Sequence, residues 1–208
     1  TAAVVDCWRE ALNRYPGTLA FADLLAPAIG YAETGYPVSR SQAHWLTFRD
    51  AETAHWPGFD ALFRPGGRNP ESGEIFRQPG LAETLRTLAK NGPSDFYHGK
   101  VADRILGALY AAGVPISAAD MASTRTVVAP PLQLNYRGLT ILAPPPPTQG
   151  ITTLQIMGIL AHIDLAGVAA DSTEHLHLVV EAVKQAFLDR GGIADPNHVD
   201  IDYSARLA

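Results

Sequence analysis

Hydrophobic residues in the first part of the chain recur every three or four positions, which is the spacing of amphipathic helices. The first run has its apolar positions at Val4, Val5, Trp8, Leu12 and Tyr15. Pro16-Gly17 follows this run and predicts its end. The next run contains Pro27, which helices tolerate mainly in their first turn, so two short helices are expected to meet there. Gly35 has the position of a C-terminal cap.

Further helices and one long loop are expected up to residue 122. The segment Ser39 to Gln42 has the spacing of a capping box and predicts the start of a third helix. Residues 56–79 are rich in Pro, Gly and Arg and show no periodicity, which predicts a long loop. Two more helices are expected to end at Asn91-Gly92 and at Gly113, and Ser117 is expected to cap a short turn. The apolar positions of these two helices are Leu81, Leu85 and Leu88, then Val101, Ile105, Leu106 and Leu109.

The spacing changes from helical to alternating after residue 122. Apolar residues alternate on both sides of Arg137-Gly138, which predicts a β-hairpin entered through Thr126–Val128. Four prolines then precede a segment from Ile151 to Leu160 that is apolar on nearly all sides, as is typical of a buried helix. Asp171 and Glu174 have the spacing of a capping box for a last helix. Its expected apolar stripe is Leu176, Val179, Val180, Val183 and Phe187.

These patterns predict an α+β fold that is mostly helical and contains a β-hairpin. The 208 residues are expected to form a single segment with three parts. Residues 1–122 are the helical part with the loop 56–79, residues 123–143 are strands, and residues 144–208 are a Pro-rich hinge with helices. Because the chain begins inside a helical pattern and stops within an apparent element, we expect a processed or truncated chain.

The composition narrows the classes of partner. The formal net charge is −5 and no Lys/Arg cluster is present, which argues against nucleic acid or an anionic membrane surface. No apolar run approaches the roughly 20 residues of a membrane-spanning helix. The single cysteine excludes an intrachain disulfide and a cysteine-based metal site. No cofactor is indicated, and the compartment stays open between cytoplasm and periplasm.

Two nucleophilic side chains near the N-terminus are candidates for catalysis. A free N-terminal Thr can use its own α-amine as base and its hydroxyl as nucleophile, so Thr1 is a candidate. The segment after Thr1 has helical spacing, however, and a helix lacks the strand-edge amides that form an oxyanion hole. Cys7 has no evident base or cationic neighbour, which favours a packed cysteine over a reactive one.

Two clusters of titratable residues lie in the last third of the chain. His175, His177 and Glu181 resemble a metal cluster, but residues two apart on a helix point in nearly opposite directions, so no metal site is expected. Asp189 and Asp195 flank Gly191-Gly192 and could form an acid pair. The end of a helix followed by a turn explains them more simply.

Several segments, in order, resemble the sequence signatures of one known enzyme family. The segment "LAPAIGYAETGYPVS" resembles the family signature LAPAI-x-x-A-E-x-G-x-P-V-S, and "SDFYHGKVADRI" resembles FY-x-G-x-x-A-x-x-I. The segment "YRGLTILAPPPPTQG" resembles a Y-R-G strand followed by PPPSSGG. The segment "HLHLVVEAVKQAFLDRGGIADP" resembles H-x-x-x-E-A-x-K-x-A-F-x-D-R with a following DP. Over almost the whole chain, these segments resemble the large subunit of the γ-glutamyltransferase family, whose members are N-terminal-nucleophile hydrolases.

The resemblance implies a fold, a partner and the position of the nucleophile. Members form a four-layer αββα sandwich, and a precursor cleaves itself into a large and a small subunit. The Thr that begins the small subunit is the nucleophile, in a Thr-Thr-His motif that is absent from this sequence. The chain is therefore expected to be a large-subunit fragment, inactive alone, with no catalytic residue of its own and a small subunit as partner.

The sequence departs from the family pattern at Thr148, Gln149 and Gly150, where the commoner motif has Ser-Ser-Gly. This variant is similar to a divergent branch of amide hydrolases and acylases, which puts γ-glutamyl specificity in doubt. The turn either edges the acyl pocket and contributes to substrate binding, or acts only as a hinge that positions the next helix. Four prolines stiffen the approach to the turn, and Gly150 allows a sharp turn into the helix.

Two functional hypotheses remain. The first is a subunit of an enzyme that cleaves or transfers an amide-linked acyl group, γ-glutamyl or a small amide. The second is a non-catalytic scaffold or binding module that retains the large-subunit fold. Under the first hypothesis, the chain alone exposes an apolar surface that a partner covers.

Overall fold

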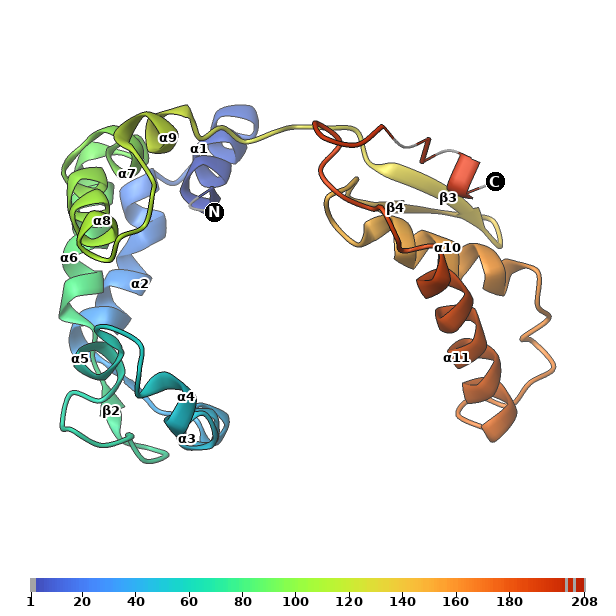
Figure 1. Ribbon diagram of the computed structural model, residues 1–208, viewed down its shortest axis with the longest axis horizontal. Helices are drawn as coiled ribbons and strands as arrows, with labels where there is room; N and C mark the ends of the chain where they lie inside the picture. The colour runs from blue at the N-terminus through green and yellow to red at the C-terminus, as the bar shows by residue number, and fades with distance from the viewer. Residues whose placement is uncertain (1–2, 201, 204, 208) are drawn as a thin grey trace. The chain divides into compact units, whose positions relative to one another are not determined.

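The computed structural model describes residues 3–200, 202–203 and 205–207 (Figure 1). The chain divides into two compact units, Thr1–Thr126 and Val127–Ala208, which we call the N-terminal unit and the C-terminal unit. The boundary between them lies inside the region 123–143, for which strands were expected. Each unit is described by itself below.

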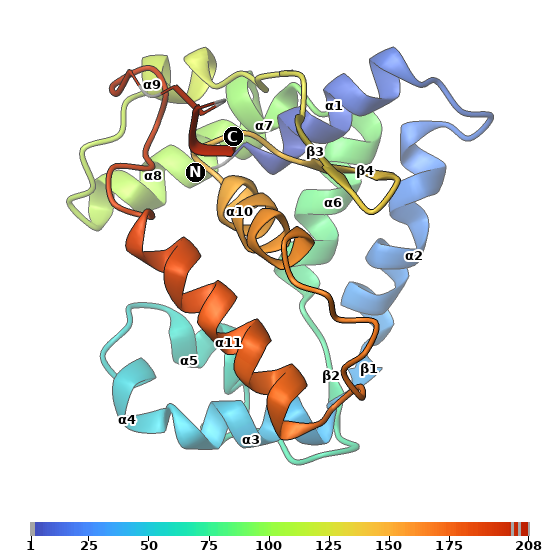
Figure 2. The same ribbon diagram turned by 90° about the vertical axis from the view of Figure 1, so that its right-hand side faces the viewer.

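The N-terminal unit is built from helices and one small sheet. Its helices are α1 (Val4–Arg14), α2 (Phe21–Thr34), α3 (Arg40–Phe48), α4 (Asp50–Thr53), α5 (Phe59–Phe63), α6 (Pro79–Asn91), α7 (Asp95–His98), α8 (Lys100–Ala111) and α9 (Ala118–Ser123). Strands β1 (Tyr36–Pro37) and β2 (Ile75–Phe76) pair antiparallel. The two longest helices of this unit, α2 and α6, lie side by side (Figures 1 and 2).

The core of this unit forms where the apolar faces of its helices meet. Leu85 and Leu88 of α6 and Val101 of α8 are buried, as the helical spacing predicted. The other buried members of the cluster are Val5, Leu25, Tyr97 and Met121. Ala82 has no exposed surface, because its small side chain faces the packed side of α6. The predicted caps at Ser39 and Ser117 are confirmed, since each hydroxyl accepts a backbone N–H of its helix.

The prediction of two short helices meeting at Pro27 is wrong, because α2 is continuous through that residue. A proline deprives the carbonyl four positions earlier of its helical donor. That carbonyl belongs to Asp23, which lies exposed in the first turn of α2. The helix packs along α6, and its buried residues Leu25 and Ala32 lie on either side of the proline.

Gly35 ends α2, as predicted, and its conformation explains why a glycine is needed. Its φ is +94°, a region that other residues rarely adopt. A Cβ at this position would also lie 2.5 Å from Cγ2 of Ile75 in β2. The glycine therefore allows the end of α2 to approach β2 closely.

The expected long loop 56–79 is only partly correct, because the segment contains α5 and β2. A buried guanidinium organises it. The side chain of Arg64 is 8% exposed and donates to Asn69 Oδ1 and Thr53 Oγ1, both at 2.7 Å. It also pairs with the carboxylates of Asp50 and Asp60. These polar contacts hold the segment in a defined conformation, which the hydrophobic pattern of the sequence could not indicate.

The C-terminal unit contains a hairpin and two long helices. Strand β3 (Leu132–Tyr136) pairs antiparallel with β4 (Leu139–Ala143), with Leu134 opposite Ile141. The turn between them has positive φ at both Arg137 and Gly138, which matches the twist of a two-residue hairpin. The predicted hairpin is thus confirmed, but residues 123–131 form no strand, since the hydrogen-bonded pairs begin only at Leu132.

Helix α10 (Gly150–Ala161) lies between the hairpin and α11 (Thr173–Leu188), and a short helix, η1 (Ala205–Leu207), also contacts it (Figure 2). Ile151 and Leu154 of α10 are fully buried. The remaining apolar side chains of α10 between residues 155 and 159 are half-buried, so the expectation of a helix covered on every face is only partly met.

The prediction for α11 needs two corrections. Its cap is Ser172, whose Oγ accepts the N–H of His175 at 3.2 Å, whereas Asp171 lies outside the helix with a φ of +61°. Its buried residues are Ala182 and Ala186 rather than the larger apolar stripe. Because small side chains let α11 approach α10 closely, the bulkier ones are left toward solvent. Leu176, Val180 and Phe187 are 50–53% exposed.

The α+β class, mostly helical with small antiparallel sheets, is confirmed. Among the described residues, no helix combines the length and the apolar character that crossing a membrane requires.

Candidate functional site

The turn at Thr148, Gln149 and Gly150 is held by local hydrogen bonds. The Thr148 hydroxyl donates toward the carbonyls of Pro144 and Pro145, at 2.9 and 3.0 Å, and accepts the N–H of Gly150 at 3.3 Å. Gln149 is the N-cap residue of α10, and its Oε1 accepts from the Thr152 hydroxyl at 3.4 Å. These contacts hold the start of α10 against the end of the proline run.

Gly150 is required by a close approach of the backbone rather than by its φ. A Cβ on this residue would lie 2.2 Å from the Pro144 carbonyl oxygen and 3.0 Å from Cβ of Ala143. The hydrogen bonds and close contacts of the turn described here join it to residues 143–153, which is what a hinge requires. A role of the three residues at the edge of the acyl pocket stays a prediction.

A cavity of about 450 Å³ lies in the C-terminal unit, between β3, α10, α11 and η1. Its apolar wall includes Leu134, Leu154, Ile159, Ala186 and Leu207. Its polar wall is formed by Asn135, Gln155, His162, Gln185, Asp189 and Arg206. This volume lies within the range of ligand-sized cavities in proteins.

Asp189 and Arg206 form a bridge across the wall of this cavity. The Arg206 guanidinium donates to the Asp189 carbonyl at 2.6 Å and lies 3.5 Å from its carboxylate. Gln155 Nε2 donates to the same carboxylate at 2.5 Å. Asp195 is engaged elsewhere, because its carboxylate accepts both N–H groups of Asn197 at 2.9 Å. Asp189 and Asp195 therefore have separate structural roles, in keeping with the simpler interpretation of the two.

The side chains of His175 and Glu181 on α11 each have a different hydrogen-bond partner. His175 Nδ1 accepts the N–H of Asp171 at 3.3 Å. Glu181 accepts from Lys184 at 2.7 Å, and this hydrogen bond lowers the pKa of the Glu181 carboxyl. Within the described part of the chain, no group of three His, Cys, Asp or Glu residues is placed to hold a metal ion.

The most strongly perturbed carboxyl is one that sequence analysis missed. Asp6 is 3% exposed, and its carboxylate accepts from Arg9 Nε at 2.8 Å and from the N–H of Thr126 at 2.6 Å. The hydrogen bond from Arg9 is the main cause that lowers its pKa to about 2; burial opposes this shift. The backbone N–H of Asp6 donates to the Tyr97 hydroxyl at 2.9 Å. Only the three-residue spacing to Arg9 could have indicated this pair.

A smaller, aromatic cavity of about 240 Å³ lies in the N-terminal unit. Trp45 of α3 lines it together with Trp56, Phe59 and Phe63. Arg49 at its edge is held by two hydrogen bonds to Glu52, so its charge is already paired. This cavity offers an apolar surface and no acid–base pair for catalysis.

Of the two nucleophile candidates, Cys7 is exposed rather than packed, contrary to expectation. Its thiol lies 3.5 Å from the Thr126 hydroxyl. A hydroxyl cannot take up a proton in the manner of a general base. Thr1 lies outside the described residues.

Comparison with known proteins connects this arrangement to a family. The sequence profile described as Gamma-glutamyltranspeptidase matches residues 1–208. The oxamate amidohydrolase proenzyme of Klebsiella pneumoniae is 41% identical over 211 residues, which cover 99% of this chain and 40% of that protein. The chain thus spans two fifths of the length of that relative.

Solved structures show the same fold. A cephalosporin acylase from Bacillus halodurans matches 98% of this chain and 39% of its own, with 31% identity and a TM-score of 0.90. A gamma-glutamyltranspeptidase from Pseudomonas nitroreducens, complexed with L-DON, matches 98% of this chain and 61% of its own, with 31% identity and a TM-score of 0.89. The resemblance found in the motifs is confirmed, and its extension to amidohydrolases and acylases is matched by these relatives. The chain belongs to the Gamma-glutamyltranspeptidase family.

Proposed function

We propose that this chain is part of the large subunit of an amidohydrolase or acyltransferase whose nucleophilic Thr lies outside these 208 residues. The observation that carries the proposal is the match of the family profile to the whole chain. Two further facts support it. The chain spans 40% of the amidohydrolase relative, which is named as a proenzyme, and the Cys7 thiol contacts the Thr126 hydroxyl rather than a general base.

In the complete enzyme, the N-terminal Thr of a small subunit attacks the carbonyl carbon of an amide, and its own α-amine accepts the hydroxyl proton. Backbone amides stabilise the oxyanion that forms. The C–N bond then breaks, the amine leaves with a proton, and the acyl group remains as an ester on the Thr. Water or a second amine resolves this ester and regenerates the hydroxyl. The present chain contributes helices, a hairpin and pocket wall.

The relatives and the turn at Thr148, Gln149 and Gly150 support a proposal for the substrate class. The relative with 41% identity is named for oxamate, a small amide, and a structural neighbour is named a cephalosporin acylase. Gln149 replaces a small residue of the commoner motif and is exposed at the start of α10. In our proposal its amide narrows the acyl pocket, which favours small amides and water as the acceptor.

The first test compares the 208-residue chain with the full-length protein, using oxamate and a γ-glutamyl anilide as substrates. Amine release is expected from the full-length protein only, because the chain lacks the nucleophile. The variant Thr1→Ala serves as control in the isolated chain. Turnover by the chain that disappears in Thr1→Ala would overturn the proposal, and a full-length protein without turnover would favour a non-catalytic scaffold.

The second test addresses the turn. In the full-length enzyme, Gln149→Ser is expected to raise transfer to a dipeptide relative to hydrolysis, because the smaller side chain leaves room for a glutamyl group. Thr153→Ser is a matched control, since Thr153 is exposed one turn further along α10. Efficient γ-glutamyl transfer by the parent, unchanged in Gln149→Ser, would assign Gln149 a purely structural role.

A further inference from the structure

Arg137 occupies a backbone position that suits other residues better. It is the first central residue of the hairpin turn, with a φ of +49°, and Gly138 follows it with a φ of +83°. A turn with positive φ at both central positions is formed most readily by Asn-Gly or Asp-Gly. Asn and Asp tolerate this conformation because their short side chains bond to the nearby backbone, which the long side chain of arginine does not do. The reason for an arginine here therefore has to come from the contacts of its side chain.

The guanidinium of Arg137 joins the hairpin to the end of α10. Its Nη2 donates to the carbonyl oxygen of Ile163 at 2.7 Å, and its central carbon lies 5.1 Å from the centre of the Tyr136 ring. Ile163 follows His162, the C-terminal cap of α10, and its own N–H donates to the Leu160 carbonyl at 3.2 Å. The carbonyl groups at the end of a helix carry partial negative charge, so a guanidinium is a suitable donor there.

The opposite end of α10 is fitted against the opposite end of the hairpin. A Cβ on Gly150 would overlap the Pro144 carbonyl oxygen and would lie 3.0 Å from Cβ of Ala143, the last residue of β4. Between the two ends, α10 packs on both strands, and a Cβ on Gly158 would lie 3.9 Å from the methyl carbons of Leu134. The 12 residues of α10, about 18 Å in length, are thus held along the hairpin at both ends.

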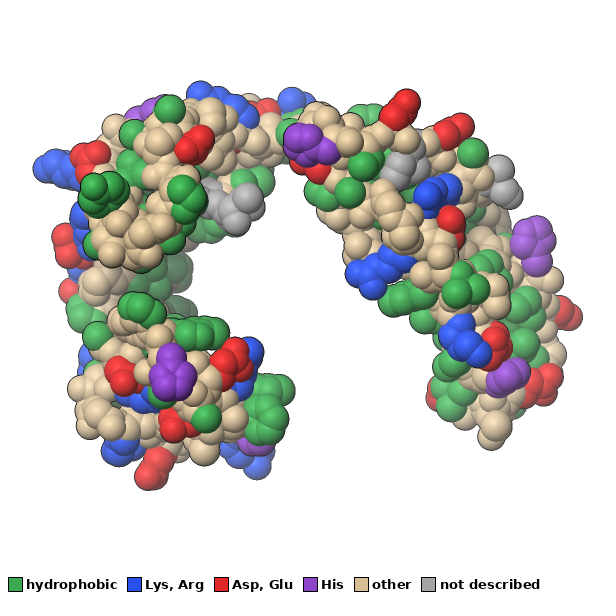
Figure 3. Space-filling model, viewed as in Figure 1, with side chains coloured by type: hydrophobic (Ala, Val, Ile, Leu, Met, Phe, Trp, Pro, Cys, Tyr) green, Lys and Arg blue, Asp and Glu red, His purple; other side chains and the backbone are tan. Residues whose placement is uncertain are grey.

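A general need for positive charge does not explain Arg137. On the face shown in Figure 3, the described Lys and Arg side chains are spread among acidic ones and form no basic patch. A surface that attracts anions needs such a cluster. What distinguishes Arg137 is its directed bond to Ile163, which ties two parts of the C-terminal unit that are 26 residues apart.

We propose that Arg137 is a positioning residue for the turn at residues 148–150. A helix whose C-terminal end is tied to the hairpin cannot slide along it, so its N-terminal end keeps a fixed place beside β4. Loss of the bond to Ile163 lets α10 shift along the hairpin, and Gln149 moves with it because Gln149 is the N-terminal cap of the helix. Arg137 itself contacts no substrate and acts through α10. The inference rests on the proposed function, in which Gln149 edges the acyl pocket.

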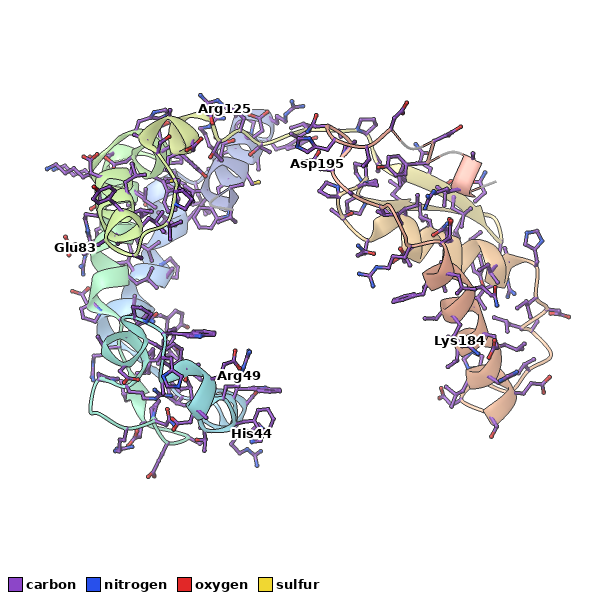
Figure 4. The ribbon with its side chains drawn as sticks, viewed as in Figure 1. His44, Arg49, Glu83, Arg125, Lys184 and Asp195 are labelled. Carbon is purple, nitrogen blue, oxygen red and sulfur yellow. The ribbon has the colours of Figure 1, made fainter. Side chains whose placement is uncertain are left out.

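The experiment uses the full-length protein and three substitutions. Arg137→Asn removes the guanidinium but gives the turn a residue that adopts positive φ readily, so the hairpin is expected to stay folded. Arg137→Lys keeps a positive charge and a donor on a long side chain, and tests whether the contact can be restored in part. Arg125→Asn is the matched control. Arg125 is also exposed and donates to two backbone carbonyls, those of Ala122 and Thr124 at 2.7 Å, but it lies in the N-terminal unit (Figure 4).

Hydrogen exchange reports how firmly the start of α10 is held. The N–H of Thr153 donates to the Gln149 carbonyl at 3.3 Å, in the first turn of the helix. Exchange of this amide is expected to become about three- to tenfold faster in Arg137→Asn, to be intermediate in Arg137→Lys, and to stay unchanged in Arg125→Asn. The amides of β3 and β4 are expected to keep their exchange rates. An unchanged rate at Thr153, or faster exchange confined to the hairpin, would overturn the inference.

Kinetics of amide hydrolysis by the same proteins separate positioning from chemistry. Because the turn moves and the nucleophile does not, KM is expected to rise about threefold in Arg137→Asn, while kcat changes by less than about twofold. Faster exchange at Thr153 with an unchanged KM would overturn the inference, since the shift would not reach the acyl pocket. An inactive parent protein with the expected exchange loses the proposed function alone, and an active one without it loses the positioning role alone. If Arg137→Asn does not fold, the same two measurements on Arg137→Lys decide the question.

Discussion

At the scale of single residues, Asp6 contributes to stability through a buried charge. Its carboxylate is buried and charged, and it accepts hydrogen bonds from Arg9 and from the backbone of Thr126. A buried charge persists only where such partners compensate for lost hydration. Asp6 therefore holds the first helix and the last residue of the N-terminal unit together.

The lowered pKa of Asp6 predicts how the free energy of unfolding depends on pH. A pKa of about 2, below the ordinary 3.8, means that this stabilisation is fully present above about pH 4 and is lost as the pH falls toward 2. The shift corresponds to about 2 kcal/mol of unfolding free energy at pH 7. Asp6→Asn is expected to lose about that amount at pH 7 and to show a flatter pH profile below pH 4.

Urea unfolding followed by tryptophan fluorescence measures this effect, since Trp8, Trp45 and Trp56 all lie in the N-terminal unit. Asp23→Asn is the control, because Asp23 is exposed in the first turn of α2. Parallel pH profiles for the parent and Asp6→Asn would show that the carboxylate makes no net contribution.

At the scale of elements, hydrophobic spacing located most helices, and glycines and capping residues located their ends. Gly35, Gly92 and Ser117 end or begin helices where the sequence predicted. These signals are local, so a single sequence carries them. The hairpin was predicted for the same reason, because alternation on both sides of a two-residue turn is a local pattern.

The errors have a common physical origin in contacts between distant parts of the chain. Pro27 stays within α2 because that helix packs along α6, which lies some fifty residues later. The loop after residue 56 is ordered by the buried Arg64, a charged residue that hydrophobic patterns treat as exposed. For the candidate site, the sequence indicated the turn at residues 148–150, but not the cavity around Gln155, which four separate elements assemble.

The start of α10 gives a prediction at the element scale. Gly150→Ala is expected to destabilise the C-terminal unit by about 1–3 kcal/mol, because the new methyl group would overlap the Pro144 carbonyl. Gly158→Ala in the same helix is the matched control. Its methyl group would meet only Leu134 methyl carbons at 3.9 Å, and alanine favours a helix by up to about 1 kcal/mol over glycine.

Hydrogen exchange of the α10 amides reports both substitutions. Faster exchange is expected in Gly150→Ala, and slower or unchanged exchange in Gly158→Ala. If both variants behaved alike, the close approach at Pro144 would not constrain this position.

At the scale of the whole molecule, the exposed apolar side chains predict how the isolated chain behaves. Tyr110 and Leu188 are 86% and 80% exposed, and α11 and β4 add further apolar surface. Such surface drives association unless a partner covers it. The 208-residue chain is expected to self-associate and to bind a hydrophobic dye, as measured by light scattering and dye fluorescence. A monodisperse monomer without dye binding would contradict the fragment interpretation.

The bond between Asp6 and Thr126 also constrains the order in which the protein can be completed during synthesis. The two residues are separated by 120 positions, whereas Arg64 and the side chains that bind it lie between residues 50 and 69. Local contacts close small loops and form early, and distant ones wait for the intervening chain. The Arg64 cluster can form while the ribosome is still translating the N-terminal unit. The Asp6 carboxylate can pair with Arg9 as soon as α1 forms, but it gains its second partner only when Thr126 has emerged, so the first helix made stays incompletely held until the N-terminal unit is finished.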